Sequence, residues 1–334
     1  MHFKKLSMIN YKNWIFLLVA SALAPCCALA ASVKYTQPTF TEWHDQQVNE
    51  VNRFPVHTAF FPFLNEQDMR AGKPQQAANY LSLEGMWKFC WVADADQRPT
   101  DFFHTDYNDA AWKELAVPAI WEMNGYGQPE YLNIGFAWRG HFKNNPPMVP
   151  TKDNHVGSYR RYIDIPADWN GRQVIAHFGS VTSNIYLWVN GHFVGYAEDS
   201  KVAAEFDLTP YLHAGRNLIA FQTFRWCDGS YDEDQDFWRL SGVARHCYLY
   251  AQNASHHFSD LRLTPSLDDN YHDGTLHIDA KTTGDGRVSF TLEDALGRIV
   301  AEKRVTTTKG DNHVEADMTV TNPQKWTAET PYLT

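Results

Sequence analysis

The sequence IYLWVNGHFV, residues 185–194, decides the fold class. An apolar run, IYLWV, leads into Asn190-Gly191, and a second apolar run begins at Phe193. Asn-Gly readily adopts the two positive φ angles that a type I′ turn requires. The stretch therefore predicts a tight β-hairpin, and with it an antiparallel sheet.

Similar strand patterns extend on both sides of this hairpin, across residues 80–253. Period-two alternation predicts further strands at Tyr159–Ile165, Val174–Phe178 and Leu218–Phe224. Prolines between Val117 and Gly157 break that segment into a long loop, and no run of ten or more residues has a helical period. We therefore expect residues 80–253 to form an antiparallel β-sandwich with long loops at one end.

A second set of strand patterns occupies residues 254–334. Gly-containing turns separate runs of alternating residues at a spacing typical of an immunoglobulin-like sandwich. The predicted strands are Leu261–Thr264, Thr275–Ala280, Arg287–Glu293, Ile299–Thr306 and His313–Val320. One more strand would be needed to close a seven-stranded sandwich, so we expect this domain to be truncated before its last strand. The predicted fold class is all-β.

The first 79 residues lack such a pattern. Residues 1–30 combine basic residues, a short apolar run and the cleavage motif Ala28-Leu29-Ala30, which together predict a secretory signal peptide. Leu23-Ala24-Pro25-Cys26 loosely resembles a lipobox. The sequence therefore leaves three locations open: the periplasm, the medium outside the cell and a lipid-anchored position in the envelope. Residues 31–79 are predicted to be an N-terminal arm that lies on another surface.

Length and charge restrict the class of protein. The 334 residues suffice for two domains, and 44% apolar with 20% charged residues excludes a disordered chain. The formal net charge is −10, and loss of the signal peptide would remove three lysines and no acid. An acidic surface disfavours nucleic acids and anionic membranes as partners.

The cysteines give no sign of a metal site. Cys26 and Cys27 belong to the predicted signal peptide, which leaves Cys90, Cys227 and Cys247 without CxxC or other ligand spacing. At most one disulfide is possible among three thiols. We expect each to behave as a small buried apolar residue.

The most informative stretch is RWCDGSYDEDQDFWRLSG, residues 225–242. Asp228, Asp232, Glu233, Asp234 and Asp236 lie within nine residues of one another and are interleaved with rings. They suggest a loop whose charges are held by cations, by arginines or by sugar hydroxyls. The alternative is a solvated acidic turn, with two tryptophans as core anchors and two arginines as ion-pair partners.

A second loop has the residue types that bind sugars. Residues 127–138, GQPEYLNIGFAW, contain aromatic rings of the kind that stack on a pyranose. They also contain the amide of Asn133, a group that can form hydrogen bonds with sugar hydroxyls. An ordinary loop covering the core is the alternative. No G-x-S-x-G or H-E-x-x-H motif is present, so hydrolases of those classes have no support.

From about Trp43 to its last residue, the chain resembles the N-terminal part of a glycoside hydrolase family 2 enzyme of the β-galactosidase type. The segments carrying the resemblance are LEGMWKF (83–89), VPAIWEMNGY (117–126), NPPMVP (145–150), VNGHFVGYAEDS (189–200), EFDL (205–208) and DGSYDEDQDFWRLSG (228–242). The last of these is long and highly specific.

The resemblance implies a jelly-roll sugar-binding domain, a galactose-binding-like β-sandwich, followed by an immunoglobulin-like sandwich. It implies that Asp236 contacts the galactosyl hydroxyls and a bound Na⁺, and that Asn133 lines the same pocket. Trp43, Asp45 and Val48 would lie in an arm that helps to assemble a homo-oligomer.

The resemblance also implies a structural Mg²⁺ near Glu42, Asp45, Glu198 and Asp228. Glu198 stands where the best-known relative has Gln. The two catalytic glutamates of a retaining glycosidase, about 5 to 5.5 Å apart, would belong to a (β/α)₈ barrel that follows these domains. No catalytic residue is therefore expected in this chain, which should be inactive alone.

The implied function is the N-terminal portion of a β-galactosidase that hydrolyses terminal β-D-galactosides in carbohydrate catabolism. The missing barrel would be in the same chain or in a separate one. A stand-alone carbohydrate-binding module and a split-enzyme subunit are the alternatives, and within the family β-glucuronidase and β-mannosidase remain open.

Overall fold

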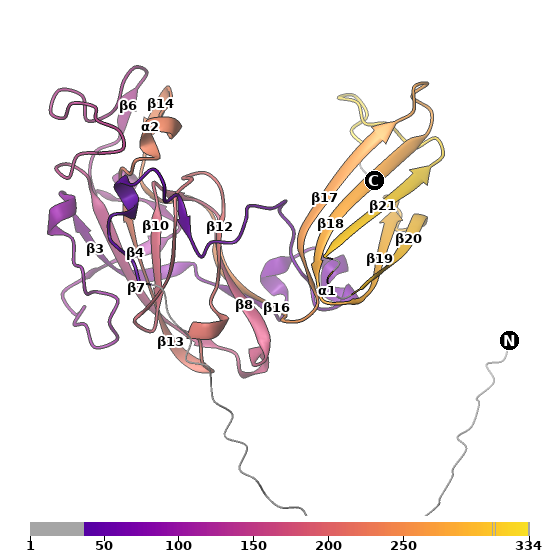
Figure 1. Cartoon of the computed structure of the whole chain (residues 1–334), viewed down its shortest axis with the longest axis horizontal. Coiled ribbons are helices and arrows are strands. Elements are labelled where there is room, and N and C mark those ends of the chain that lie inside the picture. Colours follow the sequence, from indigo (N-terminus) through magenta and orange to yellow (C-terminus); the bar gives the residue numbers. More distant parts are fainter. Residues whose placement is uncertain (1–36, 309, 311, 333–334) are drawn as a thin grey trace, which may run out of the picture. The chain divides into compact units, whose positions relative to one another are not determined.

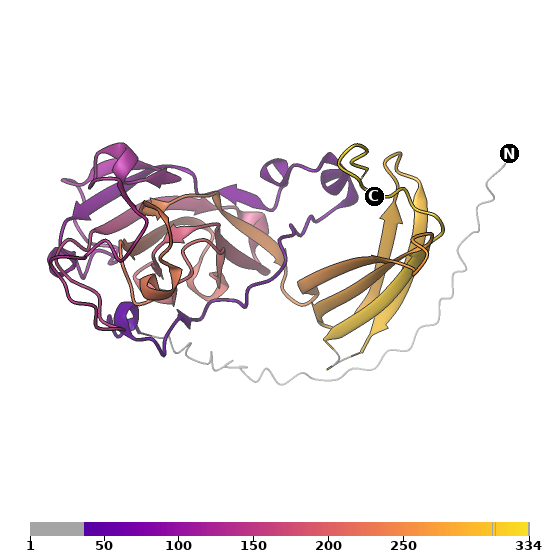
Figure 2. The same ribbon diagram turned by 90° about the horizontal axis from the view of Figure 1, so that it is seen from above.

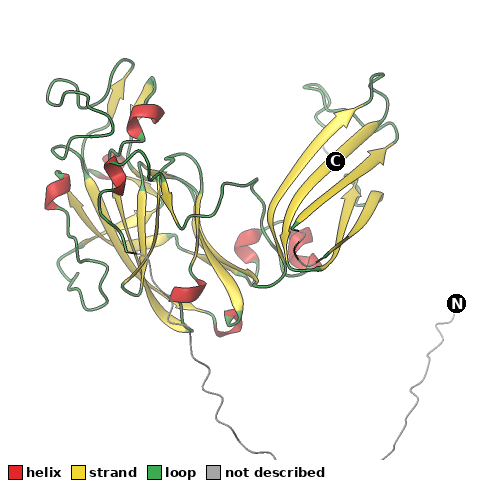
Figure 3. Cartoon of the chain, viewed as in Figure 1, coloured by secondary structure: helices red, strands yellow, loops and turns green. Residues whose placement is uncertain are grey.

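The computed structural model describes residues 37–308, 310 and 312–332. Strands dominate these residues (Figure 3), and they form a large sandwich followed in sequence by a smaller one (Figures 1 and 2). The prediction of an all-β protein is confirmed. The predicted signal peptide lies outside the described residues. Within the described ranges, no helix is both long and apolar enough to cross a membrane.

The larger sandwich packs a seven-stranded sheet on a four-stranded one. The first has the order β1-β11-β10-β13-β7-β3-β4 and the second β12-β8-β16-β2. The strands are β1 (Glu50–Val51), β2 (Tyr80–Ser82), β3 (Gly85–Val92), β4 (Lys113–Val117), β7 (Val156–Ile165), β8 (Arg172–Phe178), β10 (Ile185–Val189), β11 (His192–Ala197), β12 (Ala204–Asp207), β13 (Gly215–Phe224) and β16 (Cys247–Asn253). A small third sheet holds β5 (Ala119–Ile120), β15 (Gly242–Val243) and β9 (Val181–Thr182).

Strand β10 shows why the fold-deciding stretch is apolar throughout. Its aliphatic side chains, Ile185, Leu187 and Val189, belong to the core between the two sheets. Its aromatic side chains, Tyr186 and Trp188, point to the opposite face and join a second buried cluster. Both faces of this central strand are therefore buried, and alternation separates aliphatic from aromatic residues instead of apolar from polar ones.

The aromatic face of the large sheet is covered by the N-terminal arm. The ring of Phe40 stacks on that of Trp188 at 6.3 Å, and the ring of Trp43 stacks on that of Phe224 at 4.8 Å. Farther along the arm, β1 pairs with β11 at the edge of the sheet. The arm thus provides part of the core, which explains the many rings in the sequence.

The predicted hairpin is present with the predicted turn. Asn190 has φ 51° and Gly191 has φ 85°, and β10 and β11 pair on either side of them. The helices are all short: α1 (Glu66–Ala71), α2 (Ser230–Glu233) and the 3₁₀ turns η1 (Glu42–His44), η2 (Pro74–Gln76), η3 (Ala95–Gln97), η4 (Glu122–Asn124), η5 (Ala167–Trp169) and η6 (Thr209–Tyr211). Among the described residues no helix reaches ten residues, in agreement with the lack of a long helical period in that part of the sequence.

The smaller sandwich has a much leaner core. A three-stranded sheet, β17-β18-β21, and a two-stranded sheet, β19-β20, enclose Ile278, Ala280, Phe290, Val314, Ala316 and Met318. The strands are β17 (His257–Leu267), β18 (Gly274–Thr283), β19 (Gly286–Glu293), β20 (Ile299–Thr307) and β21 (His313–Val320). Each contains the corresponding predicted strand, and the predicted immunoglobulin-like sandwich is confirmed.

Candidate functional site

A two-stranded ladder joins the two loops that the sequence singled out. Strand β6 (Glu130–Leu132) pairs antiparallel with β14 (Phe237–Arg239), and Phe237 lies opposite Leu132. Asn133 follows Leu132 directly and Asp236 precedes Phe237 directly, so the two residues are neighbours at one end of the ladder. Figure 1 shows β6, β14 and α2 gathered at one end of the larger sandwich. The sequence predicted only a loop for residues 127–138 and did not predict this pairing.

The outer face of the ladder presents two rings and a carboxylate. Tyr131 and Trp238 lie opposite each other, with 53% and 54% of their surfaces exposed and their ring centroids 5.7 Å apart. The Tyr131 hydroxyl donates a hydrogen bond to Oδ1 of Asp236, which raises the pKa of Tyr131. Exposed rings beside a hydroxyl-binding carboxylate are the groups that bind a pyranose.

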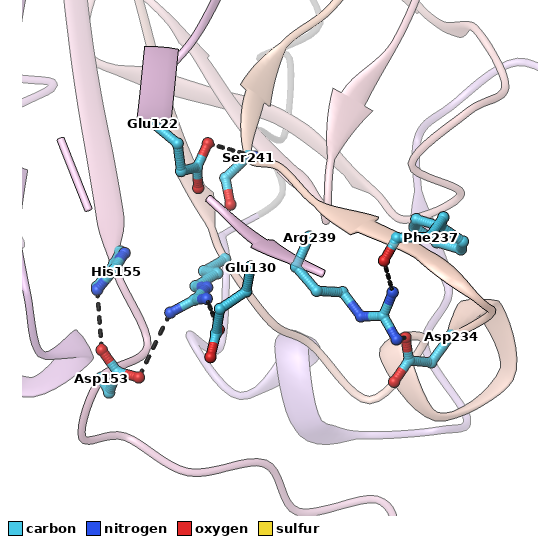
Figure 4. Close-up of polar contacts among 9 residues, drawn as sticks. Glu122, Glu130, Asp153, His155, Asp234, Phe237, Arg239 and Ser241 are labelled. Carbon is cyan, nitrogen blue, oxygen red and sulfur yellow. Dashed lines mark hydrogen bonds and ion pairs between the residues drawn. The ribbon is translucent and has the colours of Figure 1, made fainter. Parts of the chain in front are cut away.

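The inner face of the same ladder is held by ion pairs. Arg225 is almost fully buried, and its guanidinium lies 2.5 Å from Glu130 and 3.4 Å from Asp153. Arg239 pairs with Asp234 and donates to the carbonyl of Phe237 at 2.5 Å (Figure 4). Arg225, directly after β13, therefore ties β6 to the sandwich, while Arg239 holds β14 against its own loop.

Two titratable groups behind the ladder are shifted by burial. Burial raises the pKa of Glu122, whose Oε2 accepts the Ser241 backbone N–H at 2.9 Å (Figure 4). Burial and the nearby Arg225 lower the pKa of His155, which lies 3.0 Å from Asp153. Glu122 thus ties η4 to the segment that follows β14.

The acid-rich loop, residues 228–236, closes one side of a cavity of about 380 Å³. On the other side lie residues 199–202, where the Ser200 backbone N–H donates to Glu233 at 2.8 Å. The loop's acids thus have different environments: Asp234 and Glu233 are bound internally, while Asp232 and Asp236 are exposed. The tryptophans divide in the same way, since Trp226 is a core anchor and Trp238 is exposed.

A separate buried cluster contains two of the four residues predicted to surround a metal. Glu198 follows β11, Asp228 follows β13, and their carboxylates lie together with the thiol of Cys227, all ligand atoms being within 4.8 Å of one another. Burial, reinforced by Asp228, raises the pKa of Glu198 to about 9. Burial also raises the pKa of Asp228. Cys227 was expected to be a plain buried residue, so its place in this cluster was missed.

The other two predicted ligands lie in the arm beside this cluster but outside it. Glu42 is buried, with one oxygen 2.6 Å from the Thr39 backbone N–H and the other 2.9 Å from the Tyr186 hydroxyl. Asp45 is half-buried and accepts the backbone N–H of Gln47 at 3.1 Å. Among the predicted ligands, only Glu198 and Asp228 are brought together.

Another buried carboxylate, Glu205 on β12, was not predicted as special. Its two oxygens accept from His177 at 2.7 Å, from His57 at 2.9 Å and from the Tyr250 hydroxyl at 3.1 Å. Burial alone would raise the pKa of Glu205, but the two histidines outweigh it and lower the pKa to about 2. His57 belongs to the arm, so this cluster fastens the arm to β12.

Two family models match the chain. One, for the sugar binding domain of glycosyl hydrolases family 2, covers residues 80–253, and the other, for glycosyl hydrolases family 2, covers residues 256–334.

Similar proteins include β-galactosidases and a β-galactosidase large subunit. A β-galactosidase from Priestia megaterium is 35% identical over 90% of this chain, and the match spans 30% of that relative. A β-galactosidase large subunit from Leuconostoc lactis is 32% identical over 86% of this chain and 47% of its own length. A solved β-glucuronidase from an uncultured Clostridium has a TM-score of 0.59 at 20% identity, covers 82% of this chain and 43% of its own, and shows the fold alone.

Proposed function

The chain belongs to glycosyl hydrolases family 2, and from this premise we propose that it forms the sugar-facing N-terminal part of a retaining β-galactosidase. Its substrate would be a terminal β-D-galactoside. The two catalytic carboxylates would come from a (β/α)₈ barrel outside this chain. The β-galactosidase relatives support this choice, although the chain spans only 25–47% of their length.

The observation that carries the proposal is the two-faced ladder of β6 and β14. Arg225 and Arg239 pair with acids on its inner face, while its outer face exposes the rings of Tyr131 and Trp238 and the carboxylate of Asp236, which is hydrogen-bonded to Tyr131. A residue at the rim of a sugar pocket needs both an exposed carboxylate and a rigid support, because a hydroxyl-binding carboxylate contributes most when its scaffold is already rigid. Asn133, directly after β6, would add an amide to the same rim.

The same exposed carboxylate fits the expected Na⁺. One oxygen of Asp236 accepts the Tyr131 hydroxyl, and the exposed group has room for further contacts. In the complete enzyme we propose that Asp236 would share Na⁺ with barrel residues, and Na⁺ would neutralise charge beside the sugar. The role of this chain is then to hold the carboxylate at a fixed place.

Asp236→Ala in a complete enzyme, reconstituted with a barrel, tests the assignment. Loss of a charge-assisted hydroxyl contact should weaken transition-state binding of a chromogenic β-galactoside by about 2–4 kcal/mol, read from kcat/KM. Asp232→Ala, which removes another exposed acid of the same loop, is the matched control and should leave kcat/KM unchanged. Equal values for wild type and Asp236→Ala would refute the role of Asp236.

The isolated chain should show no hydrolysis, because we assign both catalytic glutamates to the barrel. Assaying the purified chain with the same β-galactoside checks this expectation. Turnover at a normal rate by the chain alone would overturn the division of roles between the two parts.

A split enzyme is the second candidate, and the large-subunit relatives favour it. In this form the barrel would be a separately encoded partner. Co-expressing the chain with a barrel-containing polypeptide should restore hydrolysis, and a separate reading frame directly downstream that encodes a (β/α)₈ barrel would support the split.

A stand-alone binding module and a different sugar are less favoured. Millimolar or tighter binding of galactose or lactose by the isolated chain, measured by calorimetry, would support the module. A β-glucuronidase must bind a carboxylate, yet Arg225 and Arg239 beside the ladder are already paired with acids. β-Mannosidase is to be separated by comparing the corresponding chromogenic substrates.

We propose further that residues 1–30 direct export, with the mature chain in the periplasm, anchored to a lipid or secreted. N-terminal sequencing of the mature protein should begin at Ala31 if signal peptidase I cleaves the chain, and a lipid-modified Cys26 would indicate the lipoprotein route. A homo-oligomer that uses the arm is the expected assembly, and sedimentation of the complete enzyme tests it.

A further inference from the structure

The cluster of Glu198, Cys227 and Asp228 offers a mixed set of donors. The three residues are buried, and one carboxylate oxygen from each acid and the Sγ of Cys227 all lie within 4.8 Å of one another. They reach one place because β10 lies between β11 and β13 and runs antiparallel to both. The segments that follow β11 and β13 therefore emerge at the same edge of the sheet.

An unpartnered oxygen indicates that this cluster lacks a positive group. Asp228 has 8% of its surface exposed, and its Oδ1 has no hydrogen-bond partner. Over the described ranges, neither Asp228 nor Glu198 forms an ion pair with Lys or Arg. A buried carboxylate without such a partner is costly, and metal coordination is one of the few ways to compensate it.

Gly229 provides the space for an ion. It has φ −54°, a conformation that any residue adopts, so its backbone does not explain the glycine. A Cβ at this position would lie 2.7 Å from Oε2 of Glu198 and 3.5 Å from Sγ of Cys227. Only glycine leaves the volume between these two donor atoms open.

The surroundings hold the donors in place. The Tyr196 hydroxyl donates to Oε1 of Glu198 at 2.6 Å, which leaves Oε2 directed toward the cluster. The arm bridges both segments through its backbone, since the Asp228 N–H donates to the Trp43 carbonyl at 3.0 Å and the Glu198 N–H to the Asn49 carbonyl at 3.1 Å. Second contacts of this kind orient ligands and tune a metal site.

The donor set does not fit magnesium well. Mg²⁺ prefers six oxygen ligands in octahedral geometry and usually keeps several waters, whereas Cys227 places a soft sulfur in a buried site. Zn²⁺ accepts sulfur and carboxylate oxygen together in a tetrahedron, at about 2.3 Å and about 2.0–2.2 Å. Three ligands within 4.8 Å of one another need only a small inward movement to reach it.

We propose that Glu198, Cys227 and Asp228 form a structural site for a thiophilic divalent cation of the zinc class instead of magnesium. On binding, the thiol of Cys227 and the carboxyl group of Glu198 release their protons to solvent, and they coordinate as a thiolate and a carboxylate. The ion ties together the ends of β11 and β13 under the arm. This site does not depend on the galactosidase assignment.

Co²⁺ is the probe that reports the sulfur ligand directly. The full chain, stripped with a chelator and loaded with Co²⁺, should show a thiolate-to-cobalt charge-transfer band and a tetrahedral visible spectrum at one ion per chain. Zn²⁺ should displace the ion stoichiometrically, and Mg²⁺ in large excess should not. Absence of the band, or displacement by Mg²⁺, would overturn the proposal.

Three variants separate this site from adventitious binding by surface histidines. Cys227→Ser should abolish the band and weaken zinc binding about 100-fold or more, beyond the 10- to 100-fold that loss of a supporting contact costs. Gly229→Ala should weaken it without removing a ligand. Cys90→Ser, at a half-buried thiol elsewhere, is the matched control and should change neither. A band retained in Cys227→Ser would refute the site, and far-UV circular dichroism verifies that each variant is folded.

Discussion

Two glutamates of the larger sandwich are equally buried but differ in their pKa and in their neighbours. Glu205 and Glu198 have 8% and 7% of their surfaces exposed, yet the pKa of the first falls to about 2 and that of the second rises to about 9. Glu205 accepts hydrogen bonds from two histidines, whereas Glu198 has another acid, Asp228, beside it. The neighbouring groups, and not the degree of burial, therefore decide whether the pKa of a buried carboxyl group falls or rises.

The largest effect expected from this difference is that of Glu205→Gln. The amide cannot accept from His57, His177 and Tyr250 as the carboxylate does, so buried donors lose their partner. We expect the free energy of unfolding in urea, followed by tryptophan fluorescence, to fall by about 3 kcal/mol.

Asp317→Asn is the matched control for that variant. It alters a second acid–histidine pair, Asp317 with His277 at 2.8 Å, which is exposed on the smaller sandwich. Exposed pairs contribute little, so no measurable loss is expected. Equal losses in the two variants would show that burial of the Glu205 cluster is irrelevant to its contribution.

The pH dependence of stability should reveal the same cluster. The folded-state pKa of Glu205 is below the unfolded value, so its contribution is complete above about pH 4.5 and is lost as the pH falls toward 2. Glu205→Gln should remove up to about 1.4 kcal/mol per pH unit of this acid slope. His57 has a raised pKa and acts in the opposite direction, since its contribution is lost as the pH rises above 6.5.

Urea titrations of wild type and Glu205→Gln between about pH 5 and 2 measure that slope. Parallel curves for the two proteins would mean that another carboxylate dominates acid unfolding.

Two tyrosines allow a smaller, matched comparison. Tyr250 donates its hydroxyl to Glu205 at 3.1 Å, and Tyr196 donates to Glu198 at 2.6 Å. Each Tyr→Phe change should lower the unfolding free energy of the metal-free chain by about 1 kcal/mol. Only Tyr196→Phe should also weaken zinc binding, by about 10-fold, because only Tyr196 supports a proposed ligand. A similar loss of zinc affinity in Tyr250→Phe would indicate a general loosening of the fold.

The hairpin at Asn190-Gly191 could be predicted because a local rule specifies it. The ladder of β6 and β14 could not, since its strands are three residues each and are separated by more than a hundred residues. For the same reason the pairing of Glu205 with His57, 148 positions away, leaves no local pattern. The resemblance led to Asn133 and Asp236, and the structure places them side by side, while their role in binding galactose stays a prediction.

The cluster of Glu198, Cys227 and Asp228 shows what the resemblance left out. It directed attention to the carboxylates of Glu42, Asp45, Glu198 and Asp228, and not to the thiol of Cys227 that lies beside two of them. Spacing rules for cysteine ligands also miss a site that combines one thiol with acids from another strand. Gly229, the residue after Asp228, could not give the signal either, because only the structure shows that its φ is not positive and that a Cβ there would crowd Glu198.

The smallest expected effect is that of Glu198→Gln in the metal-free chain. With a pKa of about 9, Glu198 is already protonated at neutral pH, so an amide of the same shape replaces a neutral acid. Its oxygen can still accept the Tyr196 hydroxyl, and its N–H can donate to Asp228. We expect the unfolding free energy to change by about 0.5 kcal/mol or less, against about 3 kcal/mol for Glu205→Gln. Added zinc should stabilise wild type and not this variant, because the amide removes an anionic ligand. A large loss for Glu198→Gln without metal would mean that Glu198 is ionised and already paired, and the contrast between the two glutamates would disappear.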